Sequence, residues 1–384
     1  MPHWSVDFLT NLPQGESSEG LHRGTWELAR ELTARGHAVR VLYPETDGES
    51  APADFPGVVS IPVPLVGVGR RPLGREIAIG RNASALLDPK ADVVVGNDAR
   101  AGAIDLPRST APGRPVFVYF VHDIALHQFD ARRAAQPSRA IRQRVGDFLD
   151  RRALTRLEGA AVARAHRVVV SSESTRSLLA KYYRVAPERL VSIPHGVPDP
   201  LEVGSRESAR TALRVPLDVP MVAFIGRNPD REGLTLALDA FRRVRSLFPG
   251  ARFVVVGSAL PPEPGVMALG DADERTRAQV LRSTDVFVYP ARFDDFALAP
   301  EAAMRYGVAT VVSAHVPMDG PELDRVRRRV ATDDAEEYAR ELAELFADPA
   351  LRRTLGEAAK TWSDQFSYAA MATRVEQMIE PLLG

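Results

Sequence analysis

The amino-acid sequence predicts an α/β protein with two domains in tandem, each built on a parallel sheet. Short, continuous apolar runs recur along the chain, and such runs indicate strands that are covered on both faces, as the strands of parallel sheets are. Segments with helical periodicity alternate with these runs. Residues 194–200, which read Pro-His-Gly-Val-Pro-Asp-Pro, interrupt the series and are the predicted linker. A chain of 384 residues is long enough for two domains that each bury a core.

The first series of elements precedes the linker. Its first helix is predicted over 21–35, because Trp26 and Leu32 share an apolar face there and Gly36 follows its end. Further helical patterns at about 136–164 and at 173–183 supply cover for the sheet. The apolar runs predict strands at 6–9, 38–43, 58–61, 92–95, 116–121, 167–171 and 190–193.

A second series of the same kind follows the linker. Two such Rossmann-like sheets in tandem leave a cleft between them, and domain interfaces are favoured ligand sites. The predicted strands lie at 221–226, 251–257, 266–269, 285–289 and 308–312. The predicted helices lie at 234–248, 274–283, 300–306, 335–346, 349–366 and 368–383.

The composition excludes several classes of protein. A formal net charge of −1 provides no field that would attract nucleic acid or an anionic membrane. The absence of cysteine excludes disulfides, thiolate metal sites and Cys nucleophiles. The first residues lack the basic region and long apolar run of a signal peptide, and no apolar stretch approaches membrane-spanning length. We therefore expect a cytoplasmic protein.

Residues 285–313 form the stretch around which the second domain is organised. A strand at 285–289 is followed by the adjacent carboxylates Asp294 and Asp295 and then by a helix opened by Pro300, a residue that suits the first helical position. In a strand–loop–helix–strand unit of this kind the loop lies at the carboxyl edge of the sheet. A helix N-terminus there presents free N–H groups and a positive dipole, so phosphate is the expected ligand. The amide donors expected there are those of Phe296, Ala297 and Leu298.

This stretch resembles the carboxylate loop of the retaining glycosyltransferases of the family-4-like group, also called glycosyl transferases group 1. The family loop reads Glu-Gly-Phe-Gly-Leu-x-x-x-Glu-Ala-Met-Ala-x-Gly, and residues 294–307 read Asp-Asp-Phe-Ala-Leu-Ala-Pro-Glu-Ala-Ala-Met-Arg-Tyr-Gly. The resemblance covers nearly the whole chain and implies the GT-B fold, in which the parallel sheets of two Rossmann-like domains face a central cleft. It implies an acceptor-side domain at 1–198, a nucleotide-sugar-binding domain at 199–366 and a C-terminal helix at 367–384 that crosses back to the first domain.

The resemblance also identifies residues expected to bind the diphosphate. In the family, the first strand of the second domain ends in Gly-Arg-x-x-x-x-Lys-Gly, whose Arg and Lys hold the two phosphates. Residues 226–233 read Gly-Arg-Asn-Pro-Asp-Arg-Glu-Gly, so Gly226 and Arg227 match, while Glu232 stands in the Lys place. Because a carboxylate repels phosphate, either Arg231 turns in as a substitute or the site holds the diphosphate weakly.

Two carboxylates and one glycine complete the expected donor site. The resemblance implies that Asp294 contacts the sugar hydroxyls. The carboxylate that holds the nucleotide ribose falls on Ala302, and Glu301 stands one residue earlier, about 100° around the helix. Glu301 therefore either reaches the ribose through a tightened loop or only complements the helix dipole. The family's Gly-Gly loop, which lets the backbone approach the donor, falls on Glu19 and Gly20.

Histidine residues supply the remaining candidates. His122 follows a fully apolar predicted strand and so stands at the same sheet edge. The family has His-Asp at this place, which implies that His122 lies close to the transferred sugar and contributes to binding or catalysis; a structural role is the alternative. His195 stands where the family has Asn and is predicted to be a hinge and structural residue. The Asp271-Ala-Asp273 sequence matches the metal-binding motif of a different glycosyltransferase fold, but it precedes a helix and is interpreted as a helix cap.

Together these residues predict a metal-independent, retaining glycosyltransferase that uses no cofactor. We expect it to move a hexose-like unit from a UDP- or GDP-type nucleotide sugar to a small soluble acceptor, such as a secondary metabolite, without binding nucleic acid or inserting stably into a membrane. Two alternatives stay open: a catalytically lapsed GT-B pseudo-enzyme or binding protein, and a coupling enzyme with an unusual donor or a non-hydroxyl acceptor. The first rests on Glu19, Glu232 and Ala302, which all differ from the family at donor-facing places.

Overall fold

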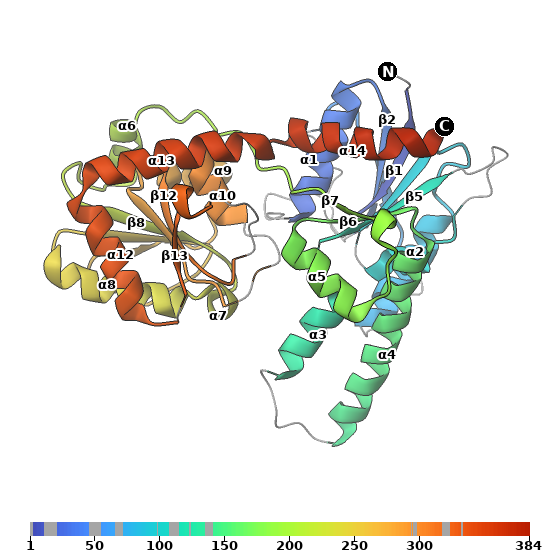
Figure 1. Ribbon diagram of the computed structural model, residues 1–384, viewed down its shortest axis with the longest axis horizontal. Coiled ribbons are helices and arrows are strands. Elements are labelled where there is room, and N and C mark those ends of the chain that lie inside the picture. Colours follow the sequence, from blue (N-terminus) through green and yellow to red (C-terminus); the bar gives the residue numbers. More distant parts are fainter. Residues whose placement is uncertain are drawn as a thin grey trace. The chain divides into compact units, whose positions relative to one another are not determined.

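The chain folds into two compact units (Figure 1). The computed structural model describes residues 3–10, 21–45, 55–65, 72–97, 99–106, 115–122, 124–134, 141–292, 294, 298–316, 323–331 and 333–384. Unit 1 combines Met1–Gly196 with Tyr368–Gly384, and unit 2 is Val197–Ser367. Each unit contains one parallel sheet with helices around it, which confirms the predicted α/β class.

Unit 1 is built on a seven-stranded sheet with the order β3-β2-β1-β4-β5-β6-β7. All described pairings are parallel, and Val6 on β1, which lies between β2 and β4, is opposite both Val39 and Val93. The direction in which successive strands are added reverses between β1 and β4, and ligands bind at such switch points. The strands are β1 Ser5–Leu9, β2 Ala38–Pro44, β3 Val59–Val63, β4 Val93–Asn97, β5 Val116–Val121, β6 Arg167–Val170 and β7 Leu190–Ser192.

Apolar side chains fill both faces of this sheet. Val93 and Val95 belong to a cluster with Trp26, whereas Val94 between them belongs to a second cluster with Ala161. Successive residues of a strand point to opposite faces, so a run without polar interruption is what two covered faces require. The helices of unit 1 are α1 Leu21–Ala34, α2 Pro72–Ser84, α3 Ala125–Ala134, α4 Ile141–Arg164, α5 Glu173–Tyr182 and α14 Tyr368–Leu383, with 3-10 turns η1 Ala99–Ala103 and η2 Pro187–Arg189.

Helix α14 packs in unit 1 although all of unit 2 precedes it in the chain. Met371 and Ile379 share an apolar cluster with Trp26 of α1. Polar contacts reinforce this packing, because Glu376 accepts a hydrogen bond from Arg35 at 2.7 Å and a carboxylate oxygen of Glu376 lies 3.0 Å from Nε2 of His37. The last helix is therefore an integral part of the core of unit 1.

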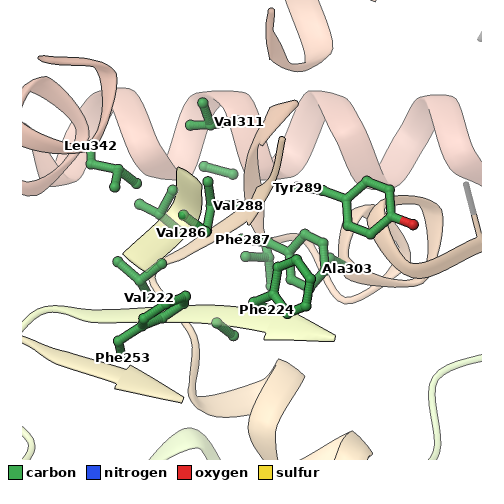
Figure 2. Packing of buried hydrophobic residues seen from close by; sticks show 14 of the residues in the cluster. Val222, Phe224, Phe253, Val286, Phe287, Val288, Tyr289, Ala303, Val311 and Leu342 are labelled. Carbon is green, nitrogen blue, oxygen red and sulfur yellow. The ribbon is translucent and has the colours of Figure 1, made fainter. Parts of the chain in front are cut away.

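Unit 2 is built on a six-stranded sheet with the order β10-β9-β8-β11-β12-β13. A large apolar cluster of this unit includes Phe224, Phe253, Phe287, Val288 and Leu342 (Figure 2). The strands are β8 Met221–Ile225, β9 Arg252–Val256, β10 Val266–Ala268, β11 Val286–Tyr289, β12 Ala309–Ser313 and β13 Arg328–Val330. The helices are α6 Arg206–Ala212, α7 Pro229–Glu232, α8 Leu234–Leu247, α9 Glu274–Ser283, α10 Leu298–Arg305, α11 Leu323–Val326, α12 Ala335–Ala347 and α13 Pro349–Ser363, with the 3-10 turn η3 Asp364–Phe366.

Several boundaries differ from the predictions. Helix α10 begins at Leu298, two residues before Pro300, because a proline is tolerated anywhere in the first turn, where its missing N–H has no helical acceptor. The short strand β13 was not predicted, since its sequence Arg-Arg-Val carries a single apolar residue. The predicted helix at 136–164 begins only at Ile141 among the described residues.

Candidate functional site

The loop that follows β8 in unit 2 packs on the loop that follows β11. Asn228 caps the short helix α7, and its side-chain oxygen accepts a hydrogen bond from the amide of Arg231 at 3.2 Å. Gly233 ends α7 with φ of +78°, and a Cβ at that position would lie 2.0 Å from the carbonyl oxygen of Pro290. Only glycine permits this backbone angle and this approach without strain.

The carboxylate of Glu232 is turned back into its own loop. Its Oε2 accepts a hydrogen bond from the amide of Asn228 at 2.9 Å, and its Oε1 accepts one from Arg231 at 3.2 Å. Gly226 leaves the space for this carboxylate, because a Cβ there would lie 2.2 Å from Oε2. Burial raises the pKa of Glu232, while the Asn228 amide and Arg231 oppose that rise. The negative charge at this position is therefore compensated inside the loop, where Arg231 is the compensating cation.

Arg227 lies at the carboxyl end of β8 with 40% of its side chain exposed. Its Nε is 3.3 Å from Oδ1 of Asp271, whose side chain is 79% exposed, so this ion pair lies at the surface. Asp273 caps α9 by accepting a hydrogen bond from the Thr276 amide at 2.7 Å, which confirms the helix-cap interpretation for that residue. A surface ion pair of this kind contributes little to the free energy of folding.

Asp294 lies in the loop between β11 and α10 and is 8% exposed. The hydroxyl of Tyr289 donates a hydrogen bond to its Oδ2 at 2.7 Å. Figure 2 shows the Tyr289 hydroxyl pointing away from the apolar cluster on which its ring packs. Burial alone would lower the pKa of Arg231, but the nearby charges of Asp294 and Glu232 raise it. Asp294 is thus fixed beside a cation at the carboxyl edge of the sheet.

Glu301 and Arg327 form a second buried charged group in unit 2. Glu301 is 2% exposed, and no described group donates a hydrogen bond to its Oε2. Burial raises the pKa of Glu301 well above its ordinary value, although the charge of Arg327 opposes the rise. Burial lowers the pKa of Arg327, which is 1% exposed, to about 10. Ala302, in the predicted ribose-binding place, packs partly buried against the apolar cluster.

The structure describes only one of the remaining residues predicted to bind the donor. Leu298 is the first residue of α10, where backbone N–H groups have no helical acceptor. Gly20, Phe296 and Ala297 lie outside the described residues, as does Asp123 beside His122.

In unit 1, His122 follows β5 and lies against His195. Its Nδ1 is 3.2 Å from Nε2 of His195, and the two rings stack with their centroids 4.9 Å apart. The side chains are buried, with exposed fractions of 4% and 3%. His195 comes shortly after β7, and the carboxyl ends of parallel strands meet at one edge of a sheet. The proximity of His122 and His195 could therefore have been predicted from the positions of the two strands. From the sequence, His195 was predicted to be a hinge and structural residue, without a link to His122.

A buried carboxylate supports the segment after His122. Glu158 on α4 is fully buried and accepts hydrogen bonds from the amides of Ala125 and Leu126 at 3.0 and 3.3 Å, which open α3. The hydroxyl of Tyr183 donates to the same carboxylate at 2.6 Å. Burial raises the pKa of Glu158, and these hydrogen bonds oppose the rise. Glu158 was not predicted from the sequence, because a charged residue in the middle of a helix gives no sign of facing inward.

Other polar residues of unit 1 lie near the same sheet edge. Asn97 at the end of β4 donates to the hydroxyl of Thr25 at 2.8 Å. Arg100 in η1 lies 2.6 Å from a carboxylate oxygen of Glu76 and is 5% exposed. Within the described ranges, three or more His, Asp or Glu residues nowhere gather closely enough to hold a metal ion. Among the helices whose residues are described, none has the length and apolar character needed to cross a bilayer.

Two models of known protein families match this chain, one reaching into the linker and one beginning after it. Residues 18–199 match the family model described as Glycosyltransferase Family 4. Residues 205–362 match the family model described as Glycosyl transferases group 1.

Curated relatives cover part of the chain. It is 30% identical over 234 residues to a D-inositol 3-phosphate glycosyltransferase of Segniliparus rotundus, an alignment that covers 56% of this chain and 52% of that protein. It is 27% identical over 214 residues to the phosphatidyl-myo-inositol mannosyltransferase of Mycolicibacterium smegmatis, which covers 50% of this chain and 52% of that protein. The chain thus spans about half the length of the curated relatives it matches.

Solved structures match over almost the full chain. The sucrose-phosphate synthase of Thermosynechococcus elongatus has a TM-score of 0.77 at 18% identity, with 98% of this chain and 99% of that chain covered. HepE of Anabaena, solved in complex with UDP-glucose, has a TM-score of 0.72 at 15% identity, with 99% and 100% covered. At these identities the likeness shows the fold alone, and the fold is GT-B.

Proposed function

The chain belongs to the GT-B glycosyltransferases of the family-4-like type, and we propose that it moves a sugar, with retention at the anomeric carbon, from a UDP- or GDP-type nucleotide sugar to a small soluble acceptor. The proposed reaction takes place in the cytoplasm and uses neither a metal ion nor a cofactor. The relatives named D-inositol 3-phosphate glycosyltransferase support a polar acceptor of small size.

The observation that carries this proposal is the charge arrangement after β8. Arg227 remains 40% exposed, whereas the carboxylate of Glu232 is bound by Arg231 and by the Asn228 amide. A pyrophosphate that approaches Arg227 therefore meets an accessible guanidinium, and the acidic residue in the family's lysine place is already neutralised. Opening the surface pair with Asp271 costs about 0–1 kcal/mol, less than a charge-assisted contact to phosphate gains.

The proposed chemistry in unit 2 concerns the departing diphosphate. The bond between the anomeric carbon and the diphosphate oxygen breaks, and its electron pair leaves with that oxygen. Arg227 and the N-terminus of α10, which begins at Leu298, stabilise the charge that develops there. The acceptor oxygen forms its bond on the same face of the carbon, and its proton passes to the departing phosphate. Gly20, Gly226 and the amides of Phe296 and Ala297 complete the proposed donor contacts.

Sugar positioning is assigned to Asp294 and His122. The hydroxyl of Tyr289 holds one oxygen of Asp294 and leaves the carboxylate further acceptor capacity for sugar hydroxyls. In unit 1, His122 is proposed to contact the transferred sugar through its ring. The burial of Glu301 at 2% exposure favours an interior role over direct contact with the ribose.

A catalytically lapsed protein that binds a nucleotide sugar without transferring it is the second candidate. Ala302 favours it, because this residue leaves the predicted ribose-binding place without a carboxylate and its neighbour Glu301 is buried. Loss of that contact weakens the hold on the nucleoside and leaves the phosphate contacts in place.

A ligand panel separates the two candidates. Thermal unfolding is measured with UDP, GDP and ADP and with UDP-glucose and GDP-mannose, and release of nucleotide from the sugar forms is assayed in parallel. A ligand present at 100 times its Kd stabilises the folded protein by about 2.7 kcal/mol. Stabilisation with release of nucleotide supports the transferase, and stabilisation without release on any acceptor supports the lapsed protein. No stabilisation by any member of the panel contradicts both.

A further inference from the structure

The chain passes between the two units twice, and the two passages pair with each other. The entering crossing, residues 197–203, opens unit 2, and the returning crossing, residues 363–367, closes it. The amide of Val197 donates a hydrogen bond to the carbonyl oxygen of Phe366 at 2.6 Å, and Val197 forms a parallel bridge with Ser367. Both covalent connections between the units therefore run through one paired element.

Arg305, the last residue of α10, contacts both crossings. Its Nη2 donates a hydrogen bond to the carboxylate of Asp199 in the entering crossing. Its Nη1 donates to the carbonyl oxygen of Ser363 in the returning crossing at 3.0 Å and lies 3.9 Å from a carboxylate oxygen of Asp364. The side chain is 6% exposed, so these acceptors take the place of water around the guanidinium. One side chain thus joins α10 to both crossings.

The surroundings of Arg305 favour these contacts. A buried charge without partners is strongly disfavoured, so the guanidinium is held to its acceptors. Pro198 and Pro200 flank Asp199 and restrict the backbone there. Arg305 also lies in the last turn of α10, where a positive charge complements the helix dipole. The family loop has alanine at this place, so the contacts of this guanidinium are a feature of this chain and not of the family pattern.

We propose that Arg305 is a positioning residue that ties α10 to both crossings, so that a shift of α10 on donor binding reaches the two connections between the units. Helix α10 has eight residues, and a helix of that length spans about 12 Å and moves as one body. Its N-terminus at Leu298 is proposed to bind the diphosphate, and its last residue holds the crossings. The transmission rests on the proposed function, whereas the contacts of Arg305 do not depend on it.

Hydrogen exchange, measured by mass spectrometry on the intact chain, tests these contacts without a ligand. Arg305→Met keeps the length of the side chain and removes its donors, whereas Arg305→Lys keeps the charge. We expect the amides of both crossings to exchange about tenfold faster in Arg305→Met, as loss of a charge-assisted hydrogen bond predicts, and at nearly the wild-type rate in Arg305→Lys. Unchanged exchange of either crossing in Arg305→Met overturns the inference.

Two further variants separate the tie from a local effect. Tyr306→Phe is the matched control, because the Tyr306 hydroxyl accepts a hydrogen bond from the Leu201 amide at 2.8 Å, in the entering crossing. It should speed exchange there and leave the returning crossing as it is. Asp199→Asn alters a side chain that is 83% exposed, which safeguards folding, and should speed exchange of the entering crossing by up to about fivefold. No increase in Asp199→Asn counts against the contact.

Saturating UDP tests whether α10 and the crossings are coupled. In the wild type UDP should slow exchange in α10 and in both crossings, and in Arg305→Met it should slow exchange in α10 alone. Coupling is reciprocal, so Arg305→Met should also bind UDP about fivefold more weakly, and Arg305→Lys should recover most of that loss. A residue that only stabilises unit 2 would leave the affinity for UDP in place. Protection of α10 without protection of the crossings in the wild type overturns the inference and leaves the donor site intact.

Failure of the proposed function gives a different result. If neither UDP nor GDP protects α10 in the wild type, the proposed donor site is contradicted, and the transmission from donor to crossings falls with it. Faster exchange of both crossings in ligand-free Arg305→Met then still supports the tie between α10 and the crossings. Circular dichroism melts establish that the compared variants are folded.

Discussion

The hydroxyl of Tyr289 donates a 2.7 Å hydrogen bond to Asp294, which joins the last residue of β11 to the loop before α10. This bond fixes a buried carboxylate at the sheet edge, beside the cation of Arg231. The position of Asp294 therefore depends on a strand residue whose ring is part of the apolar cluster. Packing of that ring in the core helps to hold Asp294 in place.

Replacing Tyr289 by Phe should loosen Asp294 without removing the ring from the core. A hydrogen bond to a charged acceptor contributes about 1.5–3 kcal/mol, so we expect unfolding in urea to become easier by about that amount. The kcat/KM for the nucleotide sugar should fall by about tenfold, because Asp294 is then free to leave its position. Tyr306→Phe is the matched control, since its hydroxyl accepts a hydrogen bond from the Leu201 amide at 2.8 Å elsewhere in unit 2. An equal fall in kcat/KM in both variants would contradict the assignment of Asp294 to sugar positioning.

Arg227 and Asp271 should have opposite effects on nucleotide binding. Arg227→Ala removes a charged contact to phosphate, and we expect UDP or GDP to bind about 10- to 100-fold more weakly. Asp271→Asn removes the competing carboxylate 3.3 Å away, and binding should tighten by up to about fivefold. Isothermal titration measures both, with Arg242→Ala as control because that arginine pairs at the surface with Glu263 and Asp239. Unaltered affinity in Arg227→Ala would place the phosphates elsewhere.

Introducing a lysine at position 232, where the family has one, should destabilise unit 2. Glu232 is 7% exposed and neutralises Arg231, so Glu232→Lys places two cations together in a buried loop. We expect a loss of about 3–5 kcal/mol in the free energy of unfolding, measured in urea. Glu232→Gln keeps an acceptor for the Asn228 amide and should lose less. A stable Glu232→Lys protein with tighter UDP binding would show that the loop rearranges to the family pattern.

The raised pKa of Glu301 predicts a pH-dependent stability. The folded protein favours the neutral carboxyl, so its contribution is complete below the ordinary pKa of 4.5 and is lost as the pH rises through the higher folded value. Glu301→Gln keeps the shape and cannot ionise. We therefore expect the stability of the variant relative to wild type to increase as the pH rises above 4.5, in urea titrations at several pH values. A difference that stays constant across pH would mean that Glu301 does not titrate in this range.

The sequence predicted the fold more completely than it predicted the contacts within the candidate site. The apolar runs placed most strands within a residue or two, because a strand covered on both faces must be apolar throughout. They also placed His122 and Arg227 after the strands β5 and β8, where the structure has them. Strand β13, at the edge of its sheet, lacks such a run and was missed.

The contacts within the site depend on residues that are distant in the chain or on backbone space. His195 lies 73 residues from His122, and no local pattern joins them. The inward turn of Glu232 requires the space that Gly226 leaves, and the buried carboxyl of Glu301 is influenced by the charge of Arg327, which is distant in the chain. From its residue type alone, Glu232 was therefore expected to repel phosphate. In the structure its carboxylate is hydrogen-bonded to the Asn228 amide and to Arg231 within the same loop.

The placement of α14 has a consequence for synthesis of the protein on the ribosome. Trp26 emerges before every residue of unit 2, but Met371 and Ile379, which share its apolar cluster, emerge only after all of them. The apolar surface of unit 1 that α14 covers therefore stays uncovered until α14 has been made, whereas unit 2 is formed by one continuous segment, residues 197–367. Domains usually fold in the order in which they are synthesised. Here the core of unit 1 can be completed only after unit 2 has been synthesised.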